Sequence, residues 1–378
     1  MNSEERRAAR YQRRQIKRQR NKNKIACISD NFDFVFSFTN LYAAYKKCIL
    51  GVGWKSSTQT YKANAVYNVY NTFIELQEGK FKSDGFFEFY LKERGKTRQI
   101  KSVTIRERVV QRCLCDFALT PMLTRQLIYD NGASCKGKGY LFAIKRLIKH
   151  LNHFYNTHGS NGYVLLFDFS KFFDSLKHEL LKRILSNTFN DPKILKLSYH
   201  FIDMFGDRGI GLGSQISQNL ALVSVNSLDH YIKERLRIKG YGRYMDDGYL
   251  IHESKEYLQK CLDAIKLICD ELGIMLNRNK TRIAKLEKGF TFLKIRFFLT
   301  HTGKIVKKVY PKSVTRMRRK LKKFKHLVEE GKMSEFDVYQ SVQSWLSHTL
   351  ILNSYKTRNS IKQLYYNLFG GKYVFKDC

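Results

Sequence analysis

The chain has 378 residues, of which 43% are hydrophobic, so it can bury a large core divided among two or three subdomains. It carries 69 Lys and Arg against 33 Asp and Glu, a formal net charge of +36. This excess attracts polyanions and predicts a nucleic-acid partner, although a solubilising, ribosome-associated or membrane-surface chain has a similar balance. The charge alone does not define an enzyme class.

Membrane insertion, secretion and zinc binding are not expected. No stretch approaches the roughly 18–20 apolar residues of a membrane span, and no apolar segment follows the basic N-terminus as in a signal peptide. The eight cysteines form no CxxC pair and have no histidine cluster nearby. Several fall at apolar positions of predicted helices, which indicates buried free thiols and a cytoplasmic location.

The N-terminal part is divided by composition. Residues 1–24 form a basic arm with too few apolar residues to pack, so we predict disorder, or helix only on nucleic acid. A solvated tail is the alternative. Residues 25–85 form an aromatic-rich N-terminal extension to which the sequence assigns no chemistry; a helical pattern covers 41–49.

Two patterns follow the extension. Apolar and polar residues alternate over 86–101 around a turn at Arg94-Gly95, which predicts a hairpin with a basic second strand. Residues 105–128 have helical periodicity, which we expect to end near Pro121.

The middle of the chain predicts a split βαβ sheet. The apolar run 163–169 predicts a central strand that ends near Asp168, and a helix should follow it through Leu176 and Ile184. Residues 241–251 predict a hairpin with Asp246-Asp247 at its turn. An amphipathic helix over 255–272, ended by Gly273, and a strand over 274–276 complete the order. In a ferredoxin-like sheet this order brings Asp168 beside the hairpin turn.

The C-terminal part is predicted to be helical and basic. Arg316 to Lys325 holds seven Lys or Arg in ten positions, and an apolar stripe runs along the opposite face. A second helix should begin at Ser334 with Asp337 as its capping partner and bury Trp345, leaving only a short tail.

The carboxylates carry the chemical prediction. Adjacent Asp246 and Asp247 repel each other, and Asp168 nearby would raise the cost unless a cation binds. Mg²⁺ prefers a few carboxylates, water and substrate phosphates, and two such ions can catalyse nucleotidyl transfer. An ordinary polar turn is the alternative, because Asp is common in turns.

Several motifs then resemble those of bacterial and phage reverse transcriptases. Tyr244-Met245-Asp246-Asp247 resembles their YMDD box, and 167–174 with 178–181 resembles their first palm motif. The remaining matches, in family order within residues 86–300, are 98–100 and 106–111 (fingers), 211–218 (between the palm motifs) and 276–281 (after the hairpin).

This resemblance implies an α+β right-hand polymerase with a ferredoxin-like palm, fingers and an α-helical thumb. Residues 86–300 would form fingers and palm, and 301–378 the thumb and tail. The implied activity is RNA-directed DNA polymerase, which adds dNTPs to a DNA or RNA primer on an RNA template. The implied cofactor is two Mg²⁺ ions, with Mn²⁺ as an alternative.

The resemblance also implies roles for individual residues. Phe173 would be a steric gate against the 2′-OH, with core packing as its alternative. The implied catalytic residues are Asp168, Asp246, Asp247 and Lys280, and the metal ligands are the three aspartates and the Phe169 carbonyl. Substrate-binding roles fall on Lys96, Arg98, Phe169, Phe173, Leu212, Gly213 and Gln218. Nucleic-acid contacts fall on Tyr244, Arg316, Arg318, Arg319, Lys322 and Lys323. A solvated charge face is the alternative for Lys96 and Arg98, and a surface lysine for Lys280.

Two departures from the family pattern matter. Leu212 stands where most relatives have Gln, and Gln218 replaces a Pro, a pattern similar to diversity-generating-retroelement enzymes and some defence-associated ones. Phe292-Leu293-Lys294 lacks the Gly that relatives often carry after the Leu.

The closest types are therefore diversity-generating and phage-defence enzymes, and the former would require a small basic accessory protein. The rivals are a non-catalytic RNA-binding protein that retains the fold and an RNA polymerase, which Phe173 opposes. The natural template and primer, the fidelity and the oligomeric state do not follow from the sequence.

Overall fold

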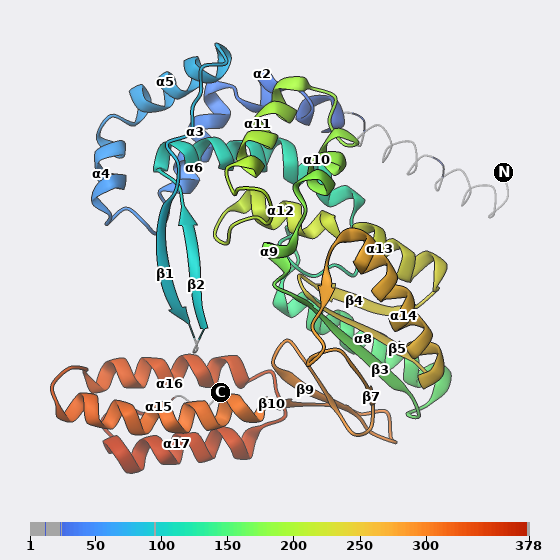
Figure 1. Ribbon diagram of the computed structural model, residues 1–378. Coiled ribbons are helices and arrows are strands. Elements are labelled where there is room, and N and C mark those ends of the chain that lie inside the picture. Colours follow the sequence, from blue (N-terminus) through green and yellow to red (C-terminus); the bar gives the residue numbers. More distant parts are fainter. Residues whose placement is uncertain (1–11, 13–22, 24, 94–95, 376–378) are drawn as a thin grey trace, which may run out of the picture. The chain divides into compact units, whose positions relative to one another are not determined.

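The computed structural model describes residues 12, 23, 25–93 and 96–375, so the predicted basic arm 1–24 lies almost wholly outside the described part. The chain forms two compact units, each built from three segments (Figure 1). One comprises Met1–Gly139, Phe169–Arg235 and Ala264–Leu276; the other comprises Tyr140–Asp168, Leu236–Asp263 and Asn277–Cys378. Among the described residues, no helix combines the length and apolar character needed to cross a membrane.

The first unit is mostly helical and contains one hairpin. Its N-terminal helices are α2 (Phe32–Val35), α3 (Phe38–Cys48), α4 (Ser56–Ala63), α5 (Ala65–Gln77), α6 (Ile105–Leu114) and α7 (Thr120–Leu123). Its later helices are α9 (Phe172–Ser175), α10 (His178–Ser186), α11 (Pro192–Asp203), α12 (Gln215–Ser224) and α13 (Asn226–His230). Side-chain caps define several starts: Asp191 accepts hydrogen bonds from Lys193 N and Ile194 N at the start of α11.

The two strands of the predicted hairpin over 86–101 are confirmed, and the predicted turn at Arg94-Gly95 lies outside the described residues. Strands β1 (Phe87–Glu93) and β2 (Lys96–Ser102) pair antiparallel, with Phe89 opposite Ile100. The next helical stretch ends at Leu123, close to the predicted end near Pro121. A π-helical segment, Cys115–Leu119, follows α6, and α7 continues past Pro121. Pro121 lies in the first turn of α7, directly after the π-helical segment.

The central sheet has the strand order that the split βαβ prediction requires. Its strands are β3 (Tyr163–Ser170), β4 (Gly240–Tyr244), β5 (Asp247–His252), β6 (Met275–Leu276) and β7 (Arg282–Lys285). The order is β4-β5-β3-β6, all antiparallel, and β7 pairs with the first half of β3. The ferredoxin-like prediction is confirmed, as is helix α14 (Lys255–Leu272), after which Gly273 adopts a φ of +71°.

Apolar residues of β3 form the centre of the second unit. Val164 and Leu166 pack with Leu147 and Leu151 of helix α8 (Tyr140–His158). The same core includes a three-stranded sheet of β8 (Phe290–Phe292), β9 (Ile295–Leu299) and β10 (Ile305–Val309), in the order β10-β9-β8. This burial on both faces explains why β3 reads as a continuous apolar run.

The end of the chain is a three-helix bundle. Its helices are α15 (Pro311–Glu329), α16 (Glu335–Thr349) and α17 (Tyr355–Phe369). The Ser334–Asp337 capping box is present, and Trp345 is partly buried. The prediction of a short tail was wrong, because α17 contributes Ile361 and Tyr365 to the bundle core, where both are almost fully buried.

The described cysteines are free, as predicted. Cys48, Cys113, Cys115, Cys261 and Cys269 are buried, and burial raises the pKa of Cys48 to about 11. Within the described residues, the single cluster of His, Cys, Asp or Glu able to hold a metal contains only aspartates. A Cys- or His-based zinc site therefore has no candidate in the described part of the chain.

Candidate active site

Three aspartates from distant parts of the sequence converge at one end of the β3–β5 pair. Asp168 lies directly opposite Asp247 in the antiparallel register, and Asp247 pairs with Tyr244 across the hairpin. The carboxylate oxygens of Asp168, Asp246 and Asp247 lie within 4.8 Å of one another. The turn differs slightly from the prediction: Met245 and Asp246 form it, and Asp247 is the first residue of β5.

Close packing behind the aspartates requires glycine at two positions of the hairpin. A Cβ on Gly248 would lie 2.2 Å from Phe167 Cζ, and one on Gly242 would lie 2.6 Å from the Tyr249 hydroxyl. Both distances are far below van der Waals contact. The Gly-rich hairpin therefore lets large rings of β3 and β5 lie flat against it and fixes where the turn projects.

A buried arginine supports the turn itself. Met245 has a φ of +53°, a left-handed conformation that costs a non-glycine residue about 1 kcal/mol or more. The Arg243 side chain, 1% exposed, donates a hydrogen bond from Nη1 to the Met245 carbonyl oxygen at 2.8 Å. Arg243 thus stabilises the conformation that aims the next two aspartates. Sequence reasoning missed this residue, although a cation three residues before the Asp246-Asp247 pair was a visible signal.

The electrostatics of the cluster favour binding of a cation. Burial, followed by repulsion from Asp246, raises the pKa of Asp247 to about 7. Burial and the charge of Asp168 likewise raise the pKa of Asp246 above its ordinary value. Both shifts mean that the negative forms are costly here unless positive charge is close.

Two residues after the hairpin hold Asp168. The Lys280 ammonium donates to Asp168 Oδ2 at 2.5 Å, and the Asn277 amide donates to Oδ1 at 3.2 Å. The Asn277 N–H also donates to the Asp168 carbonyl oxygen at 2.7 Å. Burial lowers the pKa of Lys280, but the hydrogen bond and the charge of Asp168 outweigh it and raise the pKa overall. Sequence reasoning placed Lys280 near the site and missed Asn277.

The donor set fits a small hard cation. Three carboxylates at one point, with no sulfur or imidazole ligand among them, match the oxygen ligands that Mg²⁺ or Mn²⁺ takes. The Asp168, Asp246 and Asp247 side chains would hold such ions. The predicted fourth ligand, the Phe169 carbonyl, belongs to the next residue of β3, whose ring is buried against Phe172 with centroids 5.0 Å apart.

The first unit contains the residues predicted to bind the nucleotide. Phe172 is buried, whereas Phe173 is half-buried, with ring centroids 5.8 Å apart. Gly213 adopts a φ of +107°, next to Ser214, which caps α12, and Gln218 is exposed. Leu212 is half-buried in the same loop. Lys96 and Arg98 lie on β2 as predicted, and Arg98 is exposed.

The predicted nucleic-acid residues of the bundle are all exposed. Arg318, Arg319 and Lys322 line a cleft of about 510 Å³ between α15 and α17, where Gln363 and Asn367 form the other wall. Arg318 Nη2 donates to Ser360 Oγ at 3.1 Å. The other predicted residues, Arg316 and Lys323, are exposed on α15, and Tyr244 is half-buried at the end of β4.

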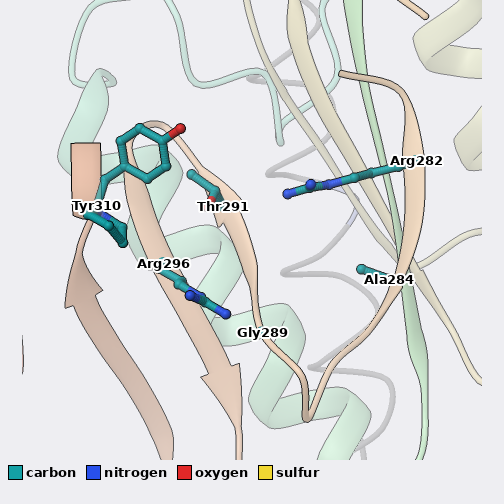
Figure 2. A pocket seen from close by; sticks show the side chains of 7 residues that line it. Arg282, Ala284, Gly289, Thr291, Arg296 and Tyr310 are labelled. Carbon is teal, nitrogen blue, oxygen red and sulfur yellow. The ribbon is translucent and has the colours of Figure 1, made fainter. Parts of the chain in front are cut away.

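A second cleft, of about 410 Å³, lies among β7, β8, β9 and the start of α15. Figure 2 shows Arg282 and Arg296 extending from different strands into this space, with Thr291 and Tyr310 beside them. Arg282 pairs in register with Leu166, two residues before Asp168 on β3. This cleft was not predicted, because the pairing of β7 with β3 and of β8 with β9 brings its lining residues together.

The family-model comparison identifies the chain. The model described as "Reverse transcriptase (RNA-dependent DNA polymerase)" matches residues 90–336, more than half of the sequence. The chain belongs to the reverse transcriptase family, which confirms the predicted family and its α+β right-hand polymerase fold.

Individual relatives are distant. Protein YkfC of Escherichia coli (strain K12) is 23% identical over 245 residues, which cover 53% of this chain and 63% of that protein. Apo telomerase from Candida tropicalis, truncated from the C-terminal domain, gives a TM-score of 0.47 with 14% identity, covering 65% of this chain and 60% of the other. Telomerase from Candida albicans with a TWJ fragment of telomeric RNA gives 0.45 with 12% identity, covering 75% and 62%. The chain thus spans less than two thirds of each.

Proposed function

We propose that this protein is an RNA-directed DNA polymerase that adds dNTPs to the 3′ end of a primer. The convergence of Asp168, Asp246 and Asp247 within 4.8 Å carries the proposal. A non-catalytic RNA-binding protein would have no need to keep three mutually repelling carboxylates together. Family membership supports the same reaction class.

The proposed chemistry assigns each side chain a distinct task. Divalent cations bound by the three aspartates would supply activation of the attacking oxygen and stabilisation of the leaving one. Asp168 and Asp246 would anchor the cations, with Asp247 assisting. Lys280 donates to Asp168 at 2.5 Å, and the charge of Asp168 raises the pKa of its ammonium. Cations bound by Asp168 would neutralise that charge and lower the pKa again, and Lys280 would then donate its proton to the departing pyrophosphate.

Nucleotide selection and nucleic-acid binding would fall on the other predicted residues. The half-buried ring of Phe173 would exclude a 2′-OH, while Lys96 and Arg98 would attract the triphosphate. The exposed Arg319 and Lys322 would contact backbone phosphates without reading sequence. An RNA template, a DNA or RNA primer and dNTPs are therefore the proposed partners.

We also propose a biological setting for this enzyme. The Leu212–Gln218 segment and its departures from the family pattern support a diversity-generating retroelement or a phage-defence system. In the first case a small basic accessory protein would be a partner. The buried free thiols suit a reducing cytoplasm, which we propose as the location.

Primer extension tests the proposal. Asp246→Ala should lower the rate of dNTP incorporation on a primed RNA template by about a thousandfold or more, because one anchor of the cations is lost. Asp270→Ala, which removes an exposed aspartate of α14, is the matched control and should keep full activity.

The same assay separates the rivals. Wild type should use dNTPs in strong preference to rNTPs, and Phe173→Val should admit rNTPs. Equal activity of Asp246→Ala and wild type would exclude the metal assignment. Exclusive use of rNTPs by wild type would identify an RNA polymerase instead.

A further inference from the structure

The N-terminal helices α3, α4 and α5 present a continuous series of aromatic rings that the polymerase reaction does not use. These helices precede residue 90, where the match to the family model begins. Six rings contact one another in sequence, with centroids 5.6–6.2 Å apart. In order, they belong to Tyr61, Tyr45, Tyr42, Phe38, Tyr70 and Phe73. We refer to this set as the aromatic series.

One ring of the aromatic series is open to solvent. Tyr45 is buried and anchors the series in the helical core, but Tyr70 is 50% exposed. On α5, Val66 and Tyr67 share the face of Tyr70 at spacings of four and three residues, and they are 59% and 67% exposed. Core packing therefore accounts for the inner rings only, and it leaves the outer face of α5 without a partner in the described unit.

The charges around the aromatic series are almost all positive. Residues 38–77 contain four lysines and one acidic residue, Glu75, which pairs with Arg106. Lys46 lies over the Tyr42 ring, with Nζ 5.0 Å from the centroid, and Lys55 lies similarly over the exposed Trp54 at 5.5 Å. Within the described residues, Lys46, Lys55 and Lys62 have no carboxylate partner. A ligand for this face must therefore be anionic and also offer flat apolar surfaces.

We propose that the aromatic series with Tyr67 and its flanking lysines is a binding site for single-stranded nucleic acid. Bases stack on exposed tyrosine rings, and lysines neutralise the phosphates between them. Duplex nucleic acid is a poor fit, because its base faces are covered by the neighbouring pairs. This second site would hold a template or guide strand independently of catalysis.

Binding to a fluorescent oligouridine RNA of about 20 nucleotides tests this proposal on the full chain. The measurement is fluorescence anisotropy in EDTA without dNTPs, so its outcome does not depend on polymerase activity. Tyr67→Ala/Tyr70→Ala should raise Kd about tenfold or more, and the phenylalanine versions of both positions should restore affinity because they keep the rings. Tyr355→Ala, which removes a tyrosine of α17 that is 69% exposed, is the matched control and should bind like wild type.

Measurements at low and high salt separate the contribution of ring stacking from that of the lysine charges. Lys46→Gln/Lys62→Gln should weaken binding at low salt and lose most of its effect at about 0.3 M salt, whereas the tyrosine variant should stay weak there. Cross-links from 4-thiouridine RNA should map to peptides within residues 38–77. Unchanged Kd in the double tyrosine variant, or cross-links only elsewhere, would overturn the proposal. Loss of a copurifying protein with unchanged RNA affinity would also overturn it and assign the face to a protein partner.

Discussion

The β4–β5 hairpin with its aspartates and the C-terminal bundle accommodate like charges in opposite ways. At the hairpin, three carboxylates lie within 4.8 Å of one another and Asp168 is only 2% exposed. On α15, seven cationic residues occupy ten positions, and all but the half-buried Lys325 are exposed, with the apolar stripe on the opposite face. Where buried carboxylates are held close together, the charge state of each depends on the others. On a solvated face of lysines and arginines, each side chain adds a small, separate contribution to the attraction of polyanions.

Among the substitutions considered, loss of the buried Arg243 should have the largest effect on stability. Arg243→Met should lower the free energy of unfolding by about 3 kcal/mol, since it breaks a buried hydrogen-bonded charge beneath a left-handed residue. It should also raise the Mg²⁺ concentration needed for activity, because Asp246 and Asp247 would no longer be held. Chemical denaturation and Mg²⁺ titration of primer extension measure the two effects.

Arg282→Met is the control for that prediction. Arg282 lies on β7 of the same sheet but is exposed, so its loss should change stability by less than about 0.5 kcal/mol. Equal stability of the two variants would show that Arg243 does not support the turn.

The pH dependence of stability should be strong at the hairpin. The pKa of Asp247 is raised from its ordinary 3.8 to about 7 by burial and by Asp246. Between these values the folded state binds more protons than the unfolded state, so the free energy of unfolding should fall as pH rises from about 4 to 7. In EDTA the melting temperature should therefore decrease over this range, and Mg²⁺ should offset the decrease at and above pH ~7.

The variant Asp247→Asn tests whether Asp247 causes this decrease of the melting temperature with pH. It should flatten the EDTA profile, because the amide cannot titrate. A change of melting temperature with pH that is the same in wild type and Asp247→Asn would contradict the raised pKa of Asp247.

Removal of a single charge from the C-terminal bundle should have a smaller effect, and only on the affinity for nucleic acid. Arg319→Gln or Lys322→Gln should weaken binding of a primer–template duplex about three- to tenfold, uniformly across sequences, and reduce the salt slope by about 1. Filter binding at several salt concentrations measures both quantities. Lys356→Gln, an exposed lysine of α17 outside the cleft, is the control. A roughly thousandfold loss of affinity, as large as the loss of activity expected for Asp246→Ala, would show that the bundle charges are not separable.

The smallest predicted effect is an increase in stability. Leu293 and Lys294 form the β8–β9 turn with φ of +47° and +62°, a conformation that favours glycine. Lys294→Gly should stabilise the protein by about 0.5–1 kcal/mol, measured by thermal unfolding. Lys304→Gly, in the next turn but without a positive φ, should instead be neutral or destabilising. This strain gives a physical meaning to the missing glycine noted in the sequence.

The periodic and local features could be predicted from the sequence. Alternation identified the β1–β2 hairpin, apolar continuity identified β3, and Ser334 with Asp337 identified the start of α16. These signals are local because each depends on hydrogen bonds or burial within a few residues. The π-helical segment Cys115–Leu119 and helix α17 were not predicted, because π-helical geometry and the burial of Ile361 depend on neighbours that the local pattern does not contain.

The sequence alone determined which chemical groups exist and in what order: three aspartates, a lysine after them and a large excess of cations. The order of the predicted elements also placed Asp168 beside the Asp246-Asp247 turn. Only the tertiary structure decided that Asp168 lies opposite Asp247, that Asn277 and Lys280 hold Asp168, and that Arg243 is buried under Met245. The physical reason is that strand register and burial set these distances. Both arise from packing between segments about 80 residues or more apart, which no local pattern of residues specifies.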